Sequence, residues 1–294
     1  MFNENRMENA IIMAAGFSSR FAPLSYEMPK ALIKVKGEVL IERQINQLKA
    51  VGIHDITIVV GYKAEMFYYL EDKYQINIVE NDEYRVKNNI STLYKVKERL
   101  KNTLICSADN YFTKNPFFTK SSHAYYSSVY VSGETDEWCL DIDEDDNILS
   151  VEVGGRDAWI MIGHVYFSED FSNEFVKIME NEYHQGDTAK NLWEDLYKRY
   201  LKSLPMKIRK YEENIIEEFD SLEELREFDA DYKISSGSEI LSTLAKKLQC
   251  QESDIINIEP LSRENEAVGF RFTLLNKNYQ YTYDNHNLEE IENE

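Results

Sequence analysis

Residues 10–32 read AIIMAAGFSSRFAPLSYEMPKAL, and the rest of the chain is arranged around this stretch. The apolar run Ala10–Ala15 has the length of a buried parallel strand and stops at Gly16. A glycine lets the backbone pass close to a ligand, and the amides after it can point at phosphate oxygens. Because the cations Arg20 and Lys30 follow, the stretch predicts a strand that feeds a phosphate-binding turn. Taken alone, the same residues also fit a tight turn with two solvated cations.

Strand and helix patterns alternate after this turn. Strands are expected at Asp55–Val60, Ile76–Val79 and Thr103–Ser107, and helices at Glu38–Val51 and Ala64–Tyr74. This alternation predicts the α/β class, with a three-layer, mainly parallel sheet that binds ligands at the carboxyl ends of its strands.

The second half of the chain is richer in short β segments. They are expected at Ala124–Val131, Trp138–Ile142, Ile148–Val153 and Ala158–Phe167. We interpret them as an added acceptor-binding part, and expect this first domain to span residues 1–231. Residues 236–294 are expected to form a small α+β appendage with a helix at Glu239–Leu248 and a hairpin turning near residue 276.

The totals exclude several classes of partner. With 53 acidic against 33 basic residues the net charge is −20, which repels nucleic acid and anionic membrane surfaces. No apolar run has the length of a membrane span, and Met1–Asn9 lacks the features of a secretory signal. We therefore expect a cytoplasmic protein without membrane insertion. Its three cysteines, Cys106, Cys139 and Cys250, lie far apart and are expected to be reduced.

Asp109 is the first candidate metal ligand. It comes two residues after the predicted strand Thr103–Ser107, at the end of the sheet where ligands bind. A carboxylate there is well placed to hold a magnesium ion against phosphates. The alternative is a turn or helix cap for the segment that follows.

A polar loop before the helix pattern at residues 90–100 is a candidate for base recognition. Asn88, Asn89 and Ser91 can donate and accept hydrogen bonds, as reading a pyrimidine edge requires. They could serve CTP or UTP. A capped loop with solvated amides is the alternative.

Each tryptophan lies near an acid. The pairs are Glu137-Trp138, Asp157 with Trp159, and Trp193-Glu194. An aromatic face attracts a quaternary ammonium, and a nearby carboxylate adds charge attraction. A choline headgroup fits such a pocket, whereas packing in the core is the alternative for each ring.

The order Ala-Ala-Gly, Arg four residues later and Pro-Lys beyond resembles the signature of nucleotidyltransferases that join a nucleoside triphosphate to a sugar or alcohol phosphate. From residue 10 to residue 232 the chain resembles bacterial CTP:phosphocholine cytidylyltransferases, in the segments VVGYKAEMFYYL, NNISTLYKV, SADNYF, DEWCL and LWEDLY. One departure is Ser18, where many members carry a second glycine. The resemblance implies a Rossmann-like, GT-A-like fold similar to the sugar-nucleotide pyrophosphorylases, CTP and phosphocholine as substrates, Mg²⁺ as cofactor and CDP-choline as product.

The resemblance also implies roles for single residues. The nucleotide-binding turn corresponds to Ala14, Ala15, Gly16, Ser18 and Arg20. Lys30 corresponds to the lysine that contacts the reacting phosphates, and Asp109 with Glu194 to the metal site. The choline pocket corresponds to Glu137 and Trp138, joined by Trp159, Trp193, Tyr84 and Tyr111.

Two alternatives to this function stay open. The same chemistry could serve a sugar 1-phosphate, phosphoethanolamine or aminoethylphosphonate, or the chain could be a catalytically inactive nucleotide-binding relative. The tail has a weaker resemblance to the opening strands of choline kinases, but this resemblance stops before any kinase lysine or catalytic loop. We therefore expect no phosphorylation activity from it, and favour a packing element or the contact of a homodimer.

Overall fold

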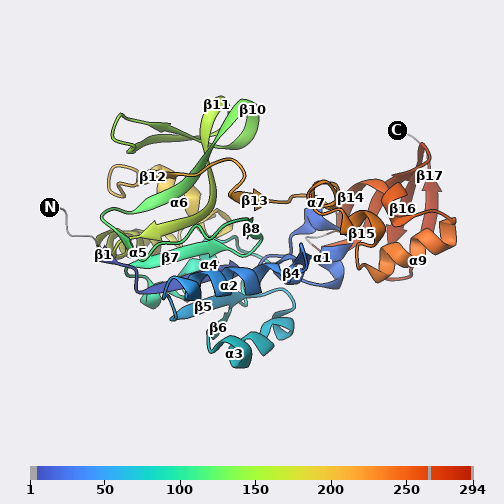
Figure 1. The fold of residues 1–294 in the computed structure, drawn as a ribbon, viewed down its shortest axis with the longest axis horizontal. Coiled ribbons are helices and arrows are strands. Elements are labelled where there is room, and N and C mark those ends of the chain that lie inside the picture. The colour runs from blue at the N-terminus through green and yellow to red at the C-terminus, as the bar shows by residue number, and fades with distance from the viewer. Residues whose placement is uncertain (1–4, 264–265, 293–294) are drawn as a thin grey trace. The chain divides into compact units, whose positions relative to one another are not determined.

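The structure is a computed structural model that describes residues 5–263 and 266–292. The chain forms two compact units (Figure 1), one of residues 1–16 with 41–218 and one of residues 17–40 with 219–294. This grouping differs from the boundary expected between residues 231 and 236. The segment that follows the phosphate-binding turn belongs to the same unit as the C-terminal residues, a contact over long sequence distance that local patterns do not reveal.

A seven-stranded sheet forms the centre of the larger unit, in the order β12-β10-β11-β7-β2-β5-β6. Four neighbouring strands are parallel: β7 (Thr103–Ser107), β2 (Asn9–Ala14), β5 (Ile56–Val60) and β6 (Asn77–Glu80). The central strands β2 and β5 are almost wholly apolar and buried, as expected where helices cover both faces of a parallel sheet. The predicted fold class is confirmed.

Short helices connect these strands. In chain order they are α2 (Leu40–Ala50), η3 (Ala64–Phe67), α3 (Tyr69–Tyr74), α4 (Ile90–Lys95), η4 (Lys97–Arg99), α5 (Glu169–Glu182), η5 (Thr188–Lys190) and α6 (Trp193–Arg199). η5 and α6 are separate elements, with residues 191–192 between them. There Asp195 accepts a hydrogen bond from the backbone N–H of Leu192 at 2.9 Å and starts a new helix.

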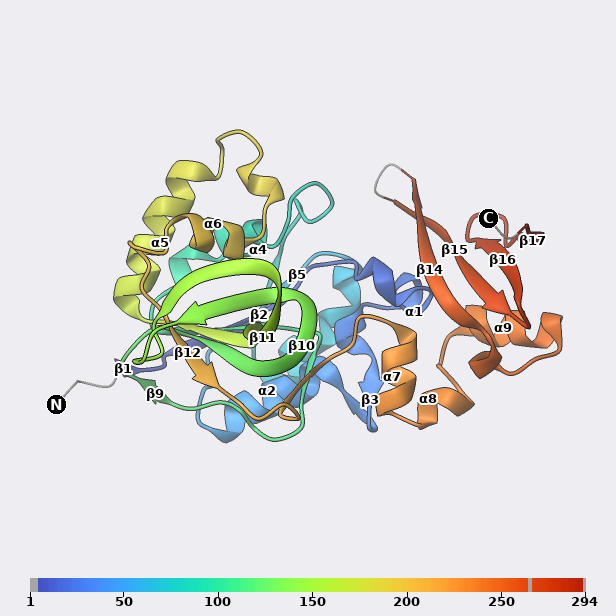
Figure 2. The ribbon, with the colours of Figure 1, turned by 90° about the horizontal axis from the view of Figure 1, so that it is seen from above.

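Two long, bent strands form the β-rich part of the larger unit. β10 (Tyr125–Ile142) and β11 (Ile148–Phe167) cover the four predicted β segments except for Ala124, and they curl back on themselves (Figure 2). Leu140 consequently pairs with both Val151 and Trp159. β12 (Lys207–Lys210) extends the sheet beside β10. Two small ladders complete the unit, β1 (Asn5–Arg6) with β9 (Lys120–Ser121) and β8 (Asn110–Phe112) with β13 (Ile216–Glu218).

The smaller unit combines two distant parts of the sequence. The first holds η1 (Ser19–Phe21), α1 (Leu24–Glu27), η2 (Lys30–Leu32), β3 (Lys34–Val35) and β4 (Glu38–Val39). The second holds α7 (Leu222–Phe228), α8 (Asp231–Ile234), α9 (Glu239–Leu248), η6 (Glu252–Asp254) and the antiparallel sheet β14 (Ile256–Arg263), β15 (Glu266–Leu274), β16 (Lys277–Thr282) and β17 (Leu288–Ile291). The predicted helix at residues 239–248 and the hairpin turn near residue 276 are confirmed.

Within the described residues no helix has the length and apolarity needed to cross a membrane. Cys106, Cys139 and Cys250 are free thiols, as the sequence predicts.

His164 on β11 is enclosed by aromatic residues. Its side chain is 1% exposed, and its Nε2 lies 3.3 Å from the hydroxyl of Tyr125 and 3.4 Å from that of Tyr211. Burial, with a smaller contribution from the charge of Arg209, lowers the pKa of the imidazole to about 3. The folded protein therefore holds this histidine neutral.

This burial predicts a loss of stability in mild acid. The pKa of His164 is lower in the folded chain than the value of about 6.5 in an unfolded chain, so the unfolded state takes up the proton first. The contribution of the neutral His164 to the free energy of unfolding is complete above pH 6.5 and decreases as the pH falls toward 3. At pH 5 it is about 2 kcal/mol smaller. Urea unfolding at pH 7 and pH 5 should show this difference between the wild type and His164→Gln; the same pH dependence in both proteins would contradict it.

Candidate active site

The backbone leaves β2 through Ala15 and Gly16, where the predicted phosphate-binding turn begins. A Cβ atom on Gly16 would meet no protein atom within 4 Å, so this position is open to a ligand. The carbonyl of Ala15 accepts a hydrogen bond from the backbone N–H of Tyr62 at 3.1 Å. On Gly61, a Cβ would lie 2.8 Å from both the Ala15 oxygen and the Tyr84 ring. The absence of a side chain at Gly61 thus lets Tyr84, a predicted pocket residue, approach the end of β2 closely.

The cations of the signature stretch lie in the smaller unit. Ser18 has φ 53°, in the left-handed region that glycine adopts most easily. This explains why glycine suits the position, and a serine there costs about 1–2 kcal/mol. The exposed guanidinium of Arg20 pairs with Asp220 at 2.7 Å. Lys30 is only 4% exposed, and its ammonium lies 5.5 Å from the centre of the Phe21 ring.

Asp109 lies at the carboxyl end of the parallel strands, as the sequence predicts. The residue before it, Ala108, donates its backbone N–H to the carbonyl of Met13 on β2 at 3.1 Å. The residue after it, Asn110, is fully buried and donates its amide to the carboxylate of Glu218 at 3.0 Å. Both neighbours are therefore anchored, which fixes the backbone that presents the half-buried Asp109 side chain.

Glu194 lies in the first turn of α6 and is held by two side chains. Its carboxylate accepts hydrogen bonds from the amide of Asn89 at 3.1 Å and from the hydroxyl of Tyr126 at 3.3 Å. The Asn89 oxygen in turn accepts from the backbone N–H of Trp193 at 2.7 Å. Burial raises the pKa of the Glu194 carboxyl to about 7, against the lowering effect of the Asn89 bond. A cation beside this carboxylate would offset the cost of burying its charge.

The three residues expected to read the base have different environments. Ser91 is fully buried: its hydroxyl donates to the carbonyl of Asn88 at 2.7 Å and accepts from the amide of Asn81 at 2.8 Å. The expectation that Ser91 reads the base is corrected: its hydroxyl is bonded to Asn88 and Asn81 and holds the loop together. Asn89 makes the two contacts with α6, whereas Asn88 is exposed.

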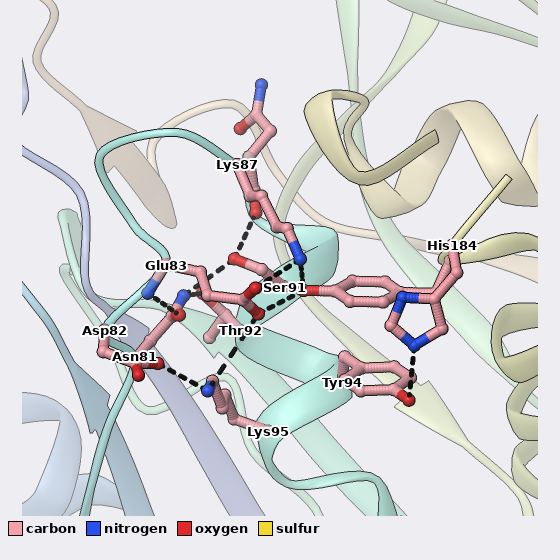
Figure 3. Close-up of polar contacts among 11 residues, drawn as sticks. Asn81, Asp82, Glu83, Lys87, Ser91, Thr92, Tyr94, Lys95 and His184 are labelled. Carbon is pink, nitrogen blue, oxygen red and sulfur yellow. Dashed lines mark hydrogen bonds and ion pairs between the residues drawn. The ribbon is translucent and has the colours of Figure 1, made fainter. Parts of the chain in front are cut away.

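Residues 81–89 are fixed in shape by a polar network (Figure 3). Lys87 contacts the carboxylate of Glu83 and lies 3.2 Å from the hydroxyl of Tyr183, which itself donates to Glu83 at 2.7 Å. The ring of Tyr183 stacks on Tyr94 of α4 with 3.8 Å between the ring centres. Lys95 pairs with Asp82 at 2.5 Å. The loop that carries Tyr84, Asn88 and Asn89 is therefore tied to both α4 and the end of α5.

Trp193 is buried in the core of the larger unit. Its side chain is 1% exposed and packs against Tyr126, Phe167 and Phe175, with ring centres 5.3 to 5.9 Å apart. The prediction that this ring binds choline is corrected to a packing role, because no face is left for a ligand. The packing of this ring anchors the start of α6 beside Glu194.

Two other predicted pocket rings already face a cation of the chain. The ammonium of Lys210 lies 5.1 Å from the centre of the Trp159 ring. The guanidinium carbon of Arg43 lies 4.6 Å from the centre of the Tyr111 ring, and Tyr111 is 7% exposed. Trp159 also lines a hollow of about 390 Å³ along the hairpin, together with Asp141, Glu152, Arg156 and Asp157 among others.

The predicted Glu137-Trp138 pair lies on β10. Glu137 is exposed, whereas Trp138 is half-buried and packs against the core of the larger unit. The pairing with β11 slips by one residue between Thr135 and Trp138, a bulge that bends the strand here. Glu137 and Trp138 are neighbours on one strand, and successive side chains of a strand point to opposite faces of the sheet. One of the two is therefore exposed while the other packs inward.

The polar contacts of Tyr126 and Asn89 with α6 were not predicted. Tyr126 belongs to no motif in the sequence, and its only sequence signal is its place in an alternating β segment. Asn89 was predicted to face the nucleotide because amides in a loop are chemically versatile. Its actual partners lie 104 and 105 residues away along the chain.

Comparison with known proteins identifies the family. Residues 10–139 match the MobA-like NTP transferase domain. The 2-aminoethylphosphonate cytidylyltransferase of Lancefieldella rimae is 38% identical over 76% of this chain and 93% of its own length. The choline-phosphate cytidylyltransferase of Streptococcus pneumoniae is 36% identical over 75% of this chain and 96% of its own.

The solved structures agree with these sequence matches. The CTP:phosphocholine cytidylyltransferase of Streptococcus pneumoniae superimposes with a TM-score of 0.74 and 36% identity, over 78% of this chain and all of that one. About a quarter of this chain lies outside each of these matches. The chain therefore belongs to the family of nucleotidyltransferases that includes the choline-phosphate and 2-aminoethylphosphonate cytidylyltransferases.

Proposed function

We propose that the protein transfers the cytidylyl group of CTP to phosphocholine, giving CDP-choline and pyrophosphate. The observation that carries this proposal is the match to the Streptococcus pneumoniae choline-phosphate cytidylyltransferase, which covers 96% of that protein in sequence and all of the solved chain in structure. It is supported by tryptophans that lie beside acids on the curled hairpin.

The reaction is a direct displacement at phosphorus. A phosphate oxygen of phosphocholine forms a bond to the α-phosphorus of CTP, and the bond to the pyrophosphate oxygen breaks in line with it. A phosphate monoester is largely dianionic near neutral pH, so no general base is needed. In this proposal Arg20 and Lys30 neutralise charge on the α-phosphate and on the departing pyrophosphate. Their role is positioning and electrostatic stabilisation rather than proton transfer.

A divalent metal is expected in this family, and the residues fit Mg²⁺. Carboxylate oxygens are its preferred ligands, and it is usually held by one or two carboxylates together with substrate phosphates. In residues 5–263 and 266–292 no group of three or more His, Cys, Asp or Glu side chains that could hold a metal occurs. Asp109 and Glu194 would hold the ion, and when bound it would offset the negative charge of the phosphates.

The headgroup of the acceptor needs an aromatic surface with nearby negative charge. In our proposal Trp138 and Trp159 supply the aromatic surface, while Glu137 and the acids of the hollow beside Trp159 supply the charge. A quaternary ammonium cannot donate a conventional N–H hydrogen bond, so ring faces and nearby carboxylate charge are the groups that recognise it.

2-Aminoethylphosphonate is the second candidate acceptor. The observation in its favour is the Lancefieldella rimae relative, whose identity of 38% is similar to that of the choline-phosphate enzyme. The two acceptors carry a comparable anionic group and differ mainly at nitrogen. A primary ammonium needs hydrogen-bond acceptors, whereas a quaternary ammonium favours ring faces.

Pyrophosphate release tests this choice. The purified protein is assayed with Mg²⁺, with CTP or UTP, and with phosphocholine, 2-aminoethylphosphonate, phosphoethanolamine or glucose 1-phosphate. We expect CTP with phosphocholine to give a kcat/KM at least about tenfold above any other pair, a preference of about 1.4 kcal/mol. Higher release with 2-aminoethylphosphonate would keep the chemistry and replace the acceptor. CTP binding without release from any pair would instead support the inactive-relative alternative.

A further inference from the structure

The segment of residues 17–40, called here the catalytic segment, carries Arg20 and Lys30 and has little structure of its own. Its helical pieces η1, α1 and η2 are three, four and three residues long. Helices this short are not stable alone, because nucleation costs more than so few hydrogen bonds return. The order of the catalytic segment must therefore come from packing against other residues.

Residues of the C-terminal appendage supply that packing at α1. The ring of Tyr26 stacks on the ring of Tyr283, with ring centres 3.7 Å apart and planes 8° from parallel. The next residue, Glu27, accepts a hydrogen bond at its Oε1 from the backbone N–H of Ile240 at 3.0 Å. Two successive residues between Arg20 and Lys30 are thus bound to the appendage.

The contact of Glu27 with α9 satisfies a need of that helix. The first N–H groups of a helix have no partner within it, and they carry partial positive charge. Ser238 caps one of them by accepting from Leu241 at 3.0 Å, and the Glu27 carboxylate takes another. The appendage helix and the catalytic segment therefore stabilise each other, although 213 residues separate Glu27 from Ile240 in the sequence.

Two further bonds fix the end of the catalytic segment. The hydroxyl of Tyr232 donates to the carbonyl of Lys34 at 2.6 Å. The backbone N–H of Lys36 donates to the carboxylate of Asp229 at 2.6 Å, and Asp229 is 4% exposed. Contacts with residues 219–294 are thus distributed from Arg20, which pairs with Asp220, to Lys36.

We propose that the C-terminal residues hold the catalytic segment in its nucleotide-binding conformation, with Glu27 and Tyr283 as positioning residues for Arg20 and Lys30. Neither residue needs to touch a substrate for this role. The inference rests on the proposed function only in its kinetic test, which measures the cytidylyl transfer reaction. It gives the appendage a task within the transferase rather than an activity of its own.

Hydrogen exchange and kinetics on matched variants of the full chain test this proposal. Tyr283→Ala should increase amide exchange in residues 17–40 and raise the KM for CTP about tenfold. Tyr283→Phe keeps the stacked ring and should behave as the wild type. Tyr279→Ala is the matched control, because Tyr279 stacks on Phe272 within the same sheet at 5.3 Å between ring centres. It should leave exchange in residues 17–40 and the KM for CTP unchanged.

Glu27 provides an independent pair of variants if Tyr283→Ala fails to fold. Glu27→Gln keeps an oxygen acceptor for the Ile240 N–H and should retain the wild-type KM, whereas Glu27→Ala should raise it together with the exchange of residues 17–40. Unchanged exchange in this segment, or an increase spread evenly over the whole chain, would overturn the proposal. If the wild type released no pyrophosphate, the proposed function would fail while the exchange measurement would still decide the positioning role.

Discussion

Asp109→Asn is expected to lower kcat for pyrophosphate release about a thousandfold while the protein folds normally. Asparagine has the same shape but no negative charge, so it would bind a divalent cation much more weakly and leave phosphate charge without compensation. The half-buried side chain lies between the anchored residues Ala108 and Asn110, so the backbone of the site should persist. Steady-state assays over a range of Mg²⁺ concentrations measure the loss, and the Mg²⁺ concentration for half activation should rise with it.

A charge-matched control separates this effect from the change in net charge. Asp72→Asn removes one carboxylate from the exposed surface of α3 and should keep wild-type activity. Thermal unfolding of both variants checks the fold. Retention of more than about a tenth of the activity by Asp109→Asn would remove this residue from the metal site, since a metal ligand contributes more than that to rate.

The helices and strands that could be predicted are those whose structure depends on a local sequence pattern, such as a short apolar run or a helical spacing of apolar residues. β7 occupies the predicted residues Thr103–Ser107, and β2 differs from its prediction by one residue at each end, because buried parallel strands are short apolar runs. The place of Asp109 followed from the general rule that ligands bind where parallel strands end. Helix α9 was predicted from its apolar spacing, and Ser238 caps it.

The remaining features depend on contacts between residues that are distant in sequence. A tryptophan beside an acid has the same pattern whether its ring lines a pocket or, as for Trp193, packs in the core. Likewise, an asparagine in a polar loop gives no sign that its partners are Trp193 and Glu194. The grouping of residues 17–40 with the C-terminal residues has the same origin, because it arises from packing rather than from a local propensity.

Lys30→Met should lower kcat about a hundredfold without lowering the free energy of unfolding. The Lys30 side chain is 4% exposed, and its ammonium lies near the ring of Phe21. Methionine keeps the apolar packing of the side-chain stem, and its sulfur can contact the Phe21 ring where the ammonium now lies. In the proposed function this ammonium acts on the phosphates of the bound substrates. Activity and stability should therefore change independently, which a lysine with a purely structural role would not produce.

The matched control for this variant lies in the same segment. Lys34 is exposed on β3, so Lys34→Met makes the same chemical change outside the buried position. We expect it to keep wild-type kcat, and urea unfolding should give similar free energies for all three proteins. A loss of activity in Lys30→Met that is matched by a loss of stability would assign Lys30 to the packing of the segment. Equal losses of kcat in both variants would instead assign the effect to the total positive charge of the segment. A role for the position of the Lys30 ammonium requires that only Lys30→Met loses activity.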